Sequence, residues 1–267
     1  MVLSHATGVR LPVAVLIVNA GLGDMEKFEP QLNQSEPMNF KENQKIAENQ
    51  EKARGQEKSL KLDRIRWEVE SWVDANGMGI DRNIKETVIM LNALDLPTSQ
   101  SCEGHIDSGI PVPWVRIEAP DEPEERFIGQ NAAFEKVAKK YNITLEEAKR
   151  AKIGAAYWEA MKECSKNDET EEYKKWLVEN KILMDKTKKL LGEFYKNREV
   201  DPKVKLKIYE LQGSFEVHNG GADYKPIIEA EKKLSEQEKK ARAEKLEKYR
   251  AEMQEFTKFL KDKYFKS

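Results

Sequence analysis

The segment Ser101-Cys-Glu-Gly-His105 contains a thiol, a carboxylate and an imidazole within one short stretch of sequence. Its Cys-x-x-His spacing allows two side chains on one turn to reach the same ion, and zinc accepts sulfur and nitrogen donors of this kind. Gly104 lies between them and relieves the backbone crowding that such a tight turn imposes. The sequence therefore predicts a metal site at Cys102 and His105, with zinc as the candidate ion.

These two residues make half of a metal site, so the other ligands must come from elsewhere in the chain. Of the three histidines in the sequence, His5 lies in an N-terminal segment outside the expected fold, which excludes an all-histidine site. We expect His218 to be the third ligand, with Cys164 and Asp107 as alternatives. Asp107 could instead orient the His105 ring by accepting its other N–H.

The same side chains are also compatible with covalent catalysis by a cysteine. In this hypothesis Cys102 is the thiolate nucleophile, His105 is its base, and Glu103 or Asp107 orients the imidazole. Such a pair requires the thiol and the ring to lie within hydrogen-bond distance, which the spacing neither guarantees nor forbids. The hypothesis therefore stands beside the metal site.

A third hypothesis is binding without catalysis, and a fourth is a purely structural role. The loop N–H groups, together with Ser101, Arg116 and His218, could bind an anion or another small ligand. In a structural role, Cys102 would be a small buried side chain and His105 would satisfy a loop carbonyl. The residue types alone do not choose among these alternatives.

A helix is predicted directly before this loop and a strand directly after it. Asp81 is a favourable N-cap residue, and apolar side chains from Ile84 to Leu94 recur at helical spacing. Pro97 ends this helix because the residue before a proline resists the helical conformation. Trp114 to Ala119 then alternates between two faces, which is typical of a half-buried strand. The loop should therefore lie at the rim of a sheet.

A hairpin is predicted from Val204 to His218, where the apolar period changes to two and Gln212-Gly213 occupies a two-residue turn. We expect Lys207 to pair with His218, which would place His218 on the polar face of the sheet as a wall of the site. The predicted fold class is α+β, with helices covering one face of a small, mainly antiparallel sheet. Its strands are expected near residues 98–102, 112–119, 204–211 and 214–218.

The chain is expected to have three parts. Residues 1–58 should form a flexible N-terminal segment, because apolar residues there are too sparse to build a buried face. Residues 59–225 should form the α+β core, and residues 226–267 a long C-terminal helix. The apolar run Leu11–Val18 is too short to span a bilayer, and we expect residues 1–24 to lie outside the fold.

The overall charge gives no indication of a nucleic-acid or membrane partner, because 46 basic and 48 acidic residues nearly cancel. Basic residues outnumber acidic ones locally, from Lys181 to Lys207, and we call this segment the basic stripe. An alternative function is therefore a non-catalytic interaction protein. It would bind RNA or a partner chain through the basic stripe or through the amphipathic C-terminal helix.

Cysteine usage and the motifs that the sequence lacks bound the location and the class of the protein. Two cysteines are too few for a disulfide framework, which favours reduced thiols and a cytoplasmic location. Walker, His-Glu-x-x-His and Gly-x-Ser-x-Gly patterns do not occur in the sequence. Their absence argues against the commonest nucleotide-hydrolysing, zincin and α/β-hydrolase classes.

The region from Leu91 to Ile117 resembles a group of bacterial and phage proteins that share a Ser-Cys-x-Gly-His loop. Their pattern is a helix, a Thr-x-x-Ser-Cys-x-Gly-His loop, and a strand that begins with an aromatic residue, here Trp114. The group has no established activity, so the resemblance implies that the loop is a unit and assigns no reaction. The loop is also similar to the Ser-Cys-Ser-Gly-Arg loop of the wyosine-synthesising tRNA methyltransferase family. This chain has His105 where that family has arginine, so tRNA methylation is not carried over.

Overall fold

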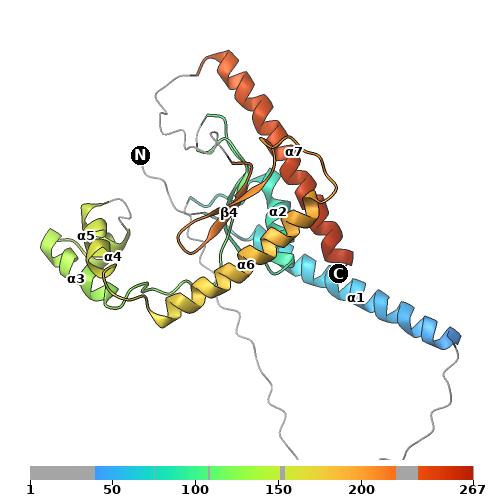
Figure 1. Cartoon of the computed structure of the whole chain (residues 1–267), viewed down its shortest axis with the longest axis horizontal. Helices are drawn as coiled ribbons and strands as arrows, with labels where there is room; N and C mark the ends of the chain where they lie inside the picture. The colour runs from blue at the N-terminus through green and yellow to red at the C-terminus, as the bar shows by residue number, and fades with distance from the viewer. Residues whose placement is uncertain (1–39, 75, 108, 151–153, 221–233, 267) are drawn as a thin grey trace, which may run out of the picture. The chain divides into compact units, whose positions relative to one another are not determined.

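The computed structural model describes residues 40–74, 76–107, 109–150, 154–220 and 234–266 (Figure 1). The chain divides into two compact units, residues 1–79 and residues 80–267. The first unit contributes the helix α1 (Phe40–Glu70), and the second contributes the sheet and the other described helices. The apolar run Leu11–Val18 and the expected boundary after residue 24 lie outside the described residues.

The helix α1 includes residues that the sequence placed in a flexible segment, while residues 1–39 of that segment lie outside the described part of the chain. It begins at Phe40 and ends at Glu70, so residues 40–58 are helical. Glu, Lys, Gln and Ala are frequent in its N-terminal half, and these residues favour a helix even where no face is buried. Three apolar side chains of the C-terminal half are buried: Leu62, Ile65 and Val69. Once this half is anchored, propagation of the helix into the polar half costs little.

Four strands form one antiparallel sheet in the order β1-β2-β4-β3. They are β1 (Thr98–Cys102), β2 (Trp114–Ile117), β3 (Lys207–Glu210) and β4 (Phe215–His218). Lys207 pairs with His218, and the Leu211 N–H donates to the Ser214 carbonyl at 2.8 Å across the Gln212-Gly213 turn. The predicted α+β fold and the predicted register of the hairpin are both confirmed.

The two faces of the sheet differ in chemistry. One face carries apolar side chains of the central strands that are almost fully buried: Val115, Ile117, Phe215 and Val217. On the other face, Trp114 pairs with both Cys102 and His218, and His218 pairs with Lys207, so these residues form one row. We call this second face the polar face. Its row begins, at the β1 edge, with the cysteine of the loop.

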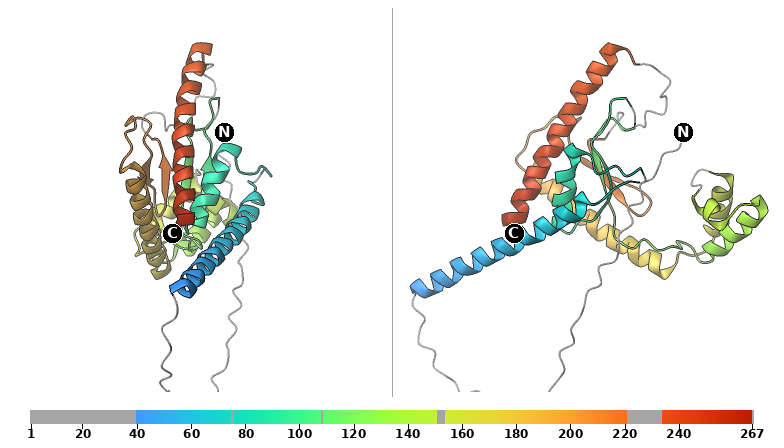
Figure 2. Two further views of the ribbon diagram at one scale, coloured as in Figure 1. Left: turned by 90° about the vertical axis from the view of Figure 1, so that its right-hand side faces the viewer. Right: turned by 180° about the vertical axis from the view of Figure 1, so that it is seen from behind.

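Three helices of the second unit lie on one side of the sheet, with the last of them between the other two (Figure 2). They are α2 (Arg82–Ala93), α6 (Glu171–Tyr195) and α7 (Glu236–Lys266). Thr257 of α7 is hydrogen-bonded to Thr87 of α2 at 2.7 Å between the hydroxyl oxygens. Phe256 contacts Phe194 of α6 with ring centroids 5.2 Å apart. The helix layer is therefore held together through α7.

The apolar stripe of the C-terminal helix is buried within the chain. Its side chains are at most 2% exposed: Leu246, Tyr249, Met253, Phe256 and Leu260. The stripe is therefore not available as a seam for a partner chain, which corrects that part of the alternative function. α7 belongs to the second unit and begins at Glu236. The expected start at residue 226 lies outside the described residues.

A small group of helices lies between β2 and α6 in the sequence: α3 (Gln130–Tyr141), α4 (Leu145–Arg150) and α5 (Ala155–Cys164). They share a hydrophobic core of their own, which includes Phe134. α4 begins with a capping box, in which Glu147 N–H donates to Thr144 Oγ1 at 3.1 Å and Thr144 N–H donates to Glu147 Oε2 at 2.7 Å. None of the described helices is both long enough and apolar enough to cross a membrane.

Candidate metal centre

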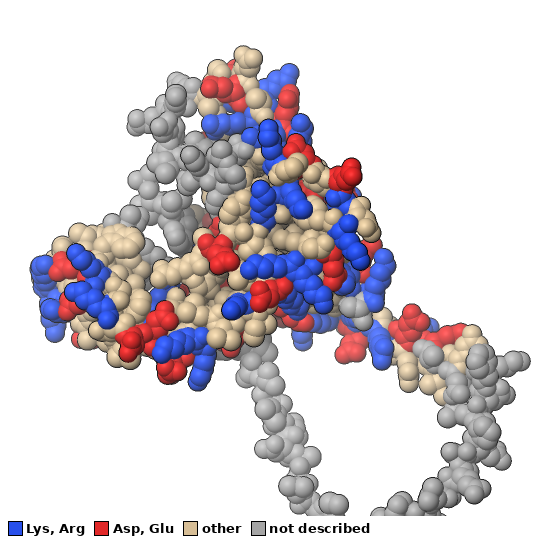
Figure 3. Space-filling model, in the orientation of Figure 1, with Lys and Arg blue, Asp and Glu red and all other residues tan. Residues whose placement is uncertain are grey.

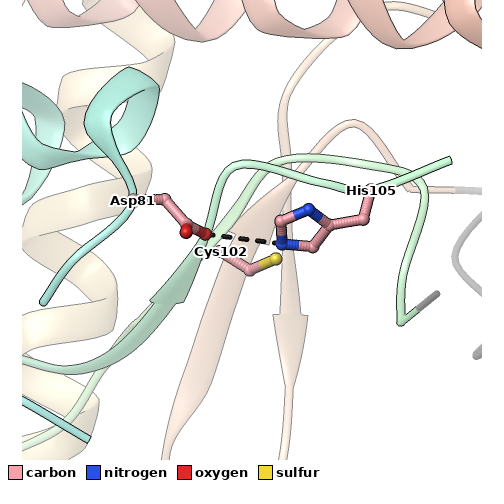
Figure 4. A group of neighbouring side chains, drawn as sticks. All are labelled: Asp81, Cys102 and His105. Atoms are coloured by element: carbon pink, nitrogen blue, oxygen red, sulfur yellow. Dashed lines mark ion pairs between the residues drawn. The ribbon is translucent and has the colours of Figure 1, made fainter. Parts of the chain in front are cut away.

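Three candidate ligands converge at the β1 edge of the sheet. Asp81 precedes α2, Cys102 ends β1, and His105 lies in the loop that follows. Their carboxylate, thiol and imidazole point toward one another (Figure 4). One ligand atom from each lies within 4.8 Å of the others, and His105 Nε2 is 3.6 Å from Asp81 Oδ2. A tetrahedral zinc site places its ligand atoms about 3.3–3.6 Å apart, so the group is close to a coordination geometry.

Gly104 gives the loop the turn that brings His105 back toward Cys102. Its φ of +81° lies in the left-handed region that other residues rarely adopt. A Cβ atom at this position would lie 2.7 Å from Leu246 Cδ1 and 2.8 Å from the carbonyl carbon of Val112. The Gly104 N–H also donates to Cys102 Sγ at 3.3 Å. Backbone conformation and close packing therefore both require glycine between the two ligands.

Glu103 ties the loop to the N-terminus of α2. Its N–H donates to Asp81 Oδ2 at 3.1 Å, and its carboxylate accepts the Asn83 N–H at 3.0 Å. Asp81 occupies the N-cap position of α2, but its side chain makes no capping hydrogen bond to the helix. The Asp81 carboxylate is held against the loop instead, where it faces His105.

Arg250 of α7 holds the loop from another direction. Its guanidinium donates to the Glu103 carbonyl at 3.0 Å, to the Gly104 carbonyl at 2.8 Å and to the Glu103 carboxylate at 3.2 Å. The side chains of Arg250 and Glu103 are each 19% exposed, so these charge-assisted bonds are largely removed from water. We call these contacts the Arg250 clamp. Glu103, predicted as an orienter of His105, is therefore engaged in positioning the loop.

The environment of Cys102 keeps its thiol protonated. Burial is the largest cause and raises the pKa of Cys102 to about 11, and the Asp81 and Glu103 carboxylates act in the same direction. The Gly104 N–H and Arg250 oppose this shift without cancelling it. A thiolate nucleophile needs the opposite environment, one that lowers the pKa of the cysteine. The arrangement therefore does not support the hypothesis of covalent catalysis by Cys102.

His218 does not lie with the three grouped ligands. It is fully buried and stacks on Tyr209, with ring centroids 3.9 Å apart. Trp114 lies between Cys102 and His218 in their row of the sheet. Two strand spacings, about 10 Å, therefore separate the backbones of Cys102 and His218. The third candidate ligand beside Cys102 and His105 is therefore Asp81 and not His218.

Two residues predicted to bind a small ligand also lie apart from the group. Ser101 pairs with Val115, so it points to the opposite face of the sheet from Cys102. Arg116 lies on the polar face, where its guanidinium donates to Glu216 Oε1 at 2.6 Å. The structure therefore brings neither of them to the centre.

The alternative ligands Asp107 and Cys164 are not part of the group either. Asp107 follows the loop and is exposed. Cys164 belongs to α5 and is 1% exposed, and its thiol is directed to the Met161 carbonyl at 3.5 Å. Cys164 is therefore a core residue of the small helix group.

The basic stripe is partly committed to contacts within the chain. Lys186 Nζ donates to the carbonyl of Leu94 at 2.6 Å, at the C-terminus of α2. Arg198 pairs with Glu252 of α7 at 2.9 Å. These residues hold α6 and its following loop against the other helices. The excess of positive charge therefore serves the fold in part, which weakens the interpretation of the stripe as a surface for RNA.

Asp81 is the candidate ligand that the sequence does not indicate. An aspartate directly before an amphipathic helix is typical of an N-cap, and that interpretation accounts for the residue without any role at a site. It lies far from Cys102 in the sequence, at a separation where spacing carries no information about contact. The absence of a capping hydrogen bond from Asp81 is the observation that points to another role, and it can be seen only in the folded chain.

No protein-family model, curated protein or solved structure matches this chain significantly. The resemblance to bacterial and phage proteins with a Ser-Cys-x-Gly-His loop therefore stays a prediction. The chemistry of the centre is inferred from its own geometry.

Loss of the Arg250 clamp is expected to weaken metal binding more than it weakens the fold. Arg250→Ala keeps all three ligands but releases the loop that carries two of them. Loss of a group that orients metal ligands typically lowers affinity about 10–100-fold. Calorimetric titration with Zn²⁺ measures this change, and equilibrium unfolding of the metal-free protein measures stability.

Glu247→Ala is the matched control for this prediction. Glu247 binds the same guanidinium at 2.9 Å through Nη1, and its side chain is 69% exposed. Its loss should leave the zinc affinity unchanged, because Arg250 keeps its contacts with the loop. A zinc affinity of Arg250→Ala equal to that of the wild type would contradict the positioning role.

Proposed function

We propose that this chain binds a divalent transition-metal ion, with zinc as the first candidate, through Asp81, Cys102 and His105. The observation that carries the proposal is the convergence of one oxygen, one sulfur and one nitrogen donor within 4.8 Å of one another. The turn at Gly104 and the Arg250 clamp support this arrangement, because they fix the loop before any ion arrives.

The donor set favours zinc over harder cations. Calcium and magnesium take oxygen ligands, whereas thiolate and imidazole suit zinc and other late transition metals. The Asp81 carboxylate and the Cys102 thiolate together carry two negative charges, which balance a divalent ion. The thiol proton must leave when the ion binds, so metal binding should release protons to solution.

Three protein ligands leave one position of a tetrahedral site for a ligand from solution. Structural zinc sites close all four positions with protein side chains, whereas sites that bind or transform small molecules keep one open. The side chains of His105 and Asp81 are 44% and 35% exposed, so solvent reaches this side of the centre. The open position would also accommodate the small-ligand hypothesis, with the ligand held by the ion.

Zinc titration of the full chain tests the proposal. The wild type is expected to bind one zinc ion per chain, measured by competition with a chromogenic chelator. Cys102→Ala and His105→Ala each remove a ligand, so the affinity should fall by more than about a hundredfold. Cys102 ends an edge strand and His105 lies in the loop after it, and neither side chain is fully buried. The metal-free variants should therefore unfold close to the wild-type denaturant concentration.

Cys164→Ala is the matched control, because it removes the other thiol of the chain from a position in α5. It should keep the wild-type stoichiometry and affinity for zinc. The proposal is overturned if the wild type binds no zinc, or if binding survives Cys102→Ala and is lost in Cys164→Ala.

A further inference from the structure

The outer face of α6 carries a regular stripe of exposed side chains. It consists of Glu171, Lys175, Val178, Ile182, Asp185 and Lys189, and we call these residues the α6 stripe. Successive members are separated alternately by four and three positions, which is the spacing of the contact seam in a two-stranded coiled coil. At its centre, Val178 and Ile182 are 60% and 62% exposed. The stripe therefore has the form of a helix-pairing surface that no other described part of the chain covers.

The opposite face of α6 is fixed within the chain, so the helix does not rotate to bury the stripe. Asn180 lies on that face, is 5% exposed, and accepts the Ala119 N–H at 2.8 Å. Trp176 Nε1 donates to the Ala119 carbonyl at 3.0 Å. These two bonds satisfy the backbone N–H and the carbonyl of Ala119, which is buried. Rotation of α6 would leave both groups without a partner, so the orientation of the helix is costly to change.

The charges of the α6 stripe have an order that complements itself in one orientation only. From the N-terminus the stripe reads acidic, basic, apolar, apolar, acidic, basic. When an identical helix lies antiparallel to it and is centred at residue 180, Glu171 faces Lys189 and Lys175 faces Asp185. Val178 then faces Ile182. In a parallel pair each charge would face its own copy, which is destabilising.

We propose that two copies of the chain associate through the α6 stripe in antiparallel, two-fold symmetric orientation. A two-fold axis makes each contact occur twice, so the apolar contact at the centre is flanked on both sides by complementary ion pairs. The paired surface is one helix face, which is below the roughly 1,200 Å² of a standard interface, so we expect a dissociation constant in the micromolar range or weaker. This inference does not depend on the metal centre.

A second copy fits the α6 stripe better than RNA does. The stripe carries two carboxylates beside its two lysines, and carboxylates repel phosphate. Over the face of the molecule shown in Figure 3, Lys and Arg side chains are likewise interspersed with Asp and Glu. Val178 and Ile182, at the centre of the stripe, would be removed from water by packing against a helix. They offer no flat aromatic surface on which a base could stack.

Sedimentation equilibrium of the full chain, over about 1 µM to 1 mM, tests the proposal. The wild type should approach a dimer mass with rising concentration, and added salt should weaken the dimer because its flanking contacts are ionic. Lys175→Glu should give a monomer, because it places like charges opposite Asp185. Lys175→Glu combined with Asp185→Lys should restore the dimer, since the ion pair is only reversed. These positions are exposed, so the fold is expected to be unchanged.

Trp158→Ser is the control for loss of exposed apolar surface in general, because Trp158 lies on α5 and is 61% exposed. It should dimerise like the wild type. A monomeric wild type at every concentration would overturn the proposal, as would a dimer that Lys175→Glu leaves intact or that the double variant fails to restore. A monomeric chain that retards a labelled single-stranded RNA would assign the face to nucleic acid and overturn it as well.

Discussion

Gly104→Ala is expected to lower the free energy of unfolding by about 2–5 kcal/mol and to abolish stoichiometric zinc binding. A left-handed conformation costs a residue with a Cβ about 1–2 kcal/mol, and forcing an atom into a packed site costs about 1–3 kcal/mol. Both costs apply here, because φ is +81° and the new atom would meet Leu246 and the backbone of Val112. Neither neighbour can move into open space, since they are 1% and 0% exposed. Equilibrium denaturation measures the first effect and zinc titration the second.

Gly109→Ala separates the cost of the left-handed backbone conformation from the cost of the close packing. Gly109 also has a positive φ, +73°, but an added Cβ would meet nothing nearer than His105 Cδ2 at 3.9 Å. Only the conformational cost remains, so the loss of stability should be about 1–2 kcal/mol and zinc binding should persist. If the two substitutions lower the free energy of unfolding equally and both variants still bind zinc, close packing at Gly104 does not determine the geometry of the site.

Acidification from pH 7 to pH 4 is expected to lower the free energy of unfolding by about 3 kcal/mol through His218 alone. Burial lowers the pKa of His218 to about 3, whereas a histidine in the unfolded chain titrates near 6.5. Between these values the unfolded chain binds a proton that the folded chain does not. The stability is therefore fully present above about pH 6.5 and falls by about 1.4 kcal/mol per pH unit as the pH drops toward 3.

Denaturant unfolding at several pH values, compared between the wild type and His218→Phe, isolates this effect. Phenylalanine keeps a ring against Tyr209 and cannot be protonated, while the carboxylates of the protein titrate alike in both chains. The wild type should lose stability with acid more steeply than the variant. Parallel stability curves would show that His218 is not held neutral by burial.

The strands could be predicted from the sequence because their signals are local. The Gln212-Gly213 turn and the alternation around it fix the register in which Lys207 meets His218. Glu210 pairs with Phe215 of the apolar face, but it lies at the end of β3, where its side chain is 67% exposed and 3.7 Å from Lys188. The start of α1 at Phe40 could not be predicted, because a polar helix has no apolar period that marks its beginning.

The candidate site could be predicted only as far as the loop itself. Its position at the rim of the sheet follows from the helix before it and the strand after it. The order of the strands decides which other residues reach the loop. Because β2 lies between β1 and β4, His218 on β4 is separated from Cys102 on β1 by a whole strand. Asp81 reaches the loop through the Glu103 N–H bond, a long-range contact that leaves no periodicity or spacing in the sequence.

X-ray absorption at the zinc edge of the zinc-loaded full chain tests the central claim most directly. A centre formed by Asp81, Cys102 and His105 requires a single sulfur at about 2.3 Å from zinc, with the other ligands being nitrogen or oxygen at about 2.0–2.2 Å. We expect that spectrum for the wild type, and a spectrum without the sulfur contribution for Cys102→Ser. A wild-type spectrum with no sulfur, or with two sulfurs, would contradict the proposed centre.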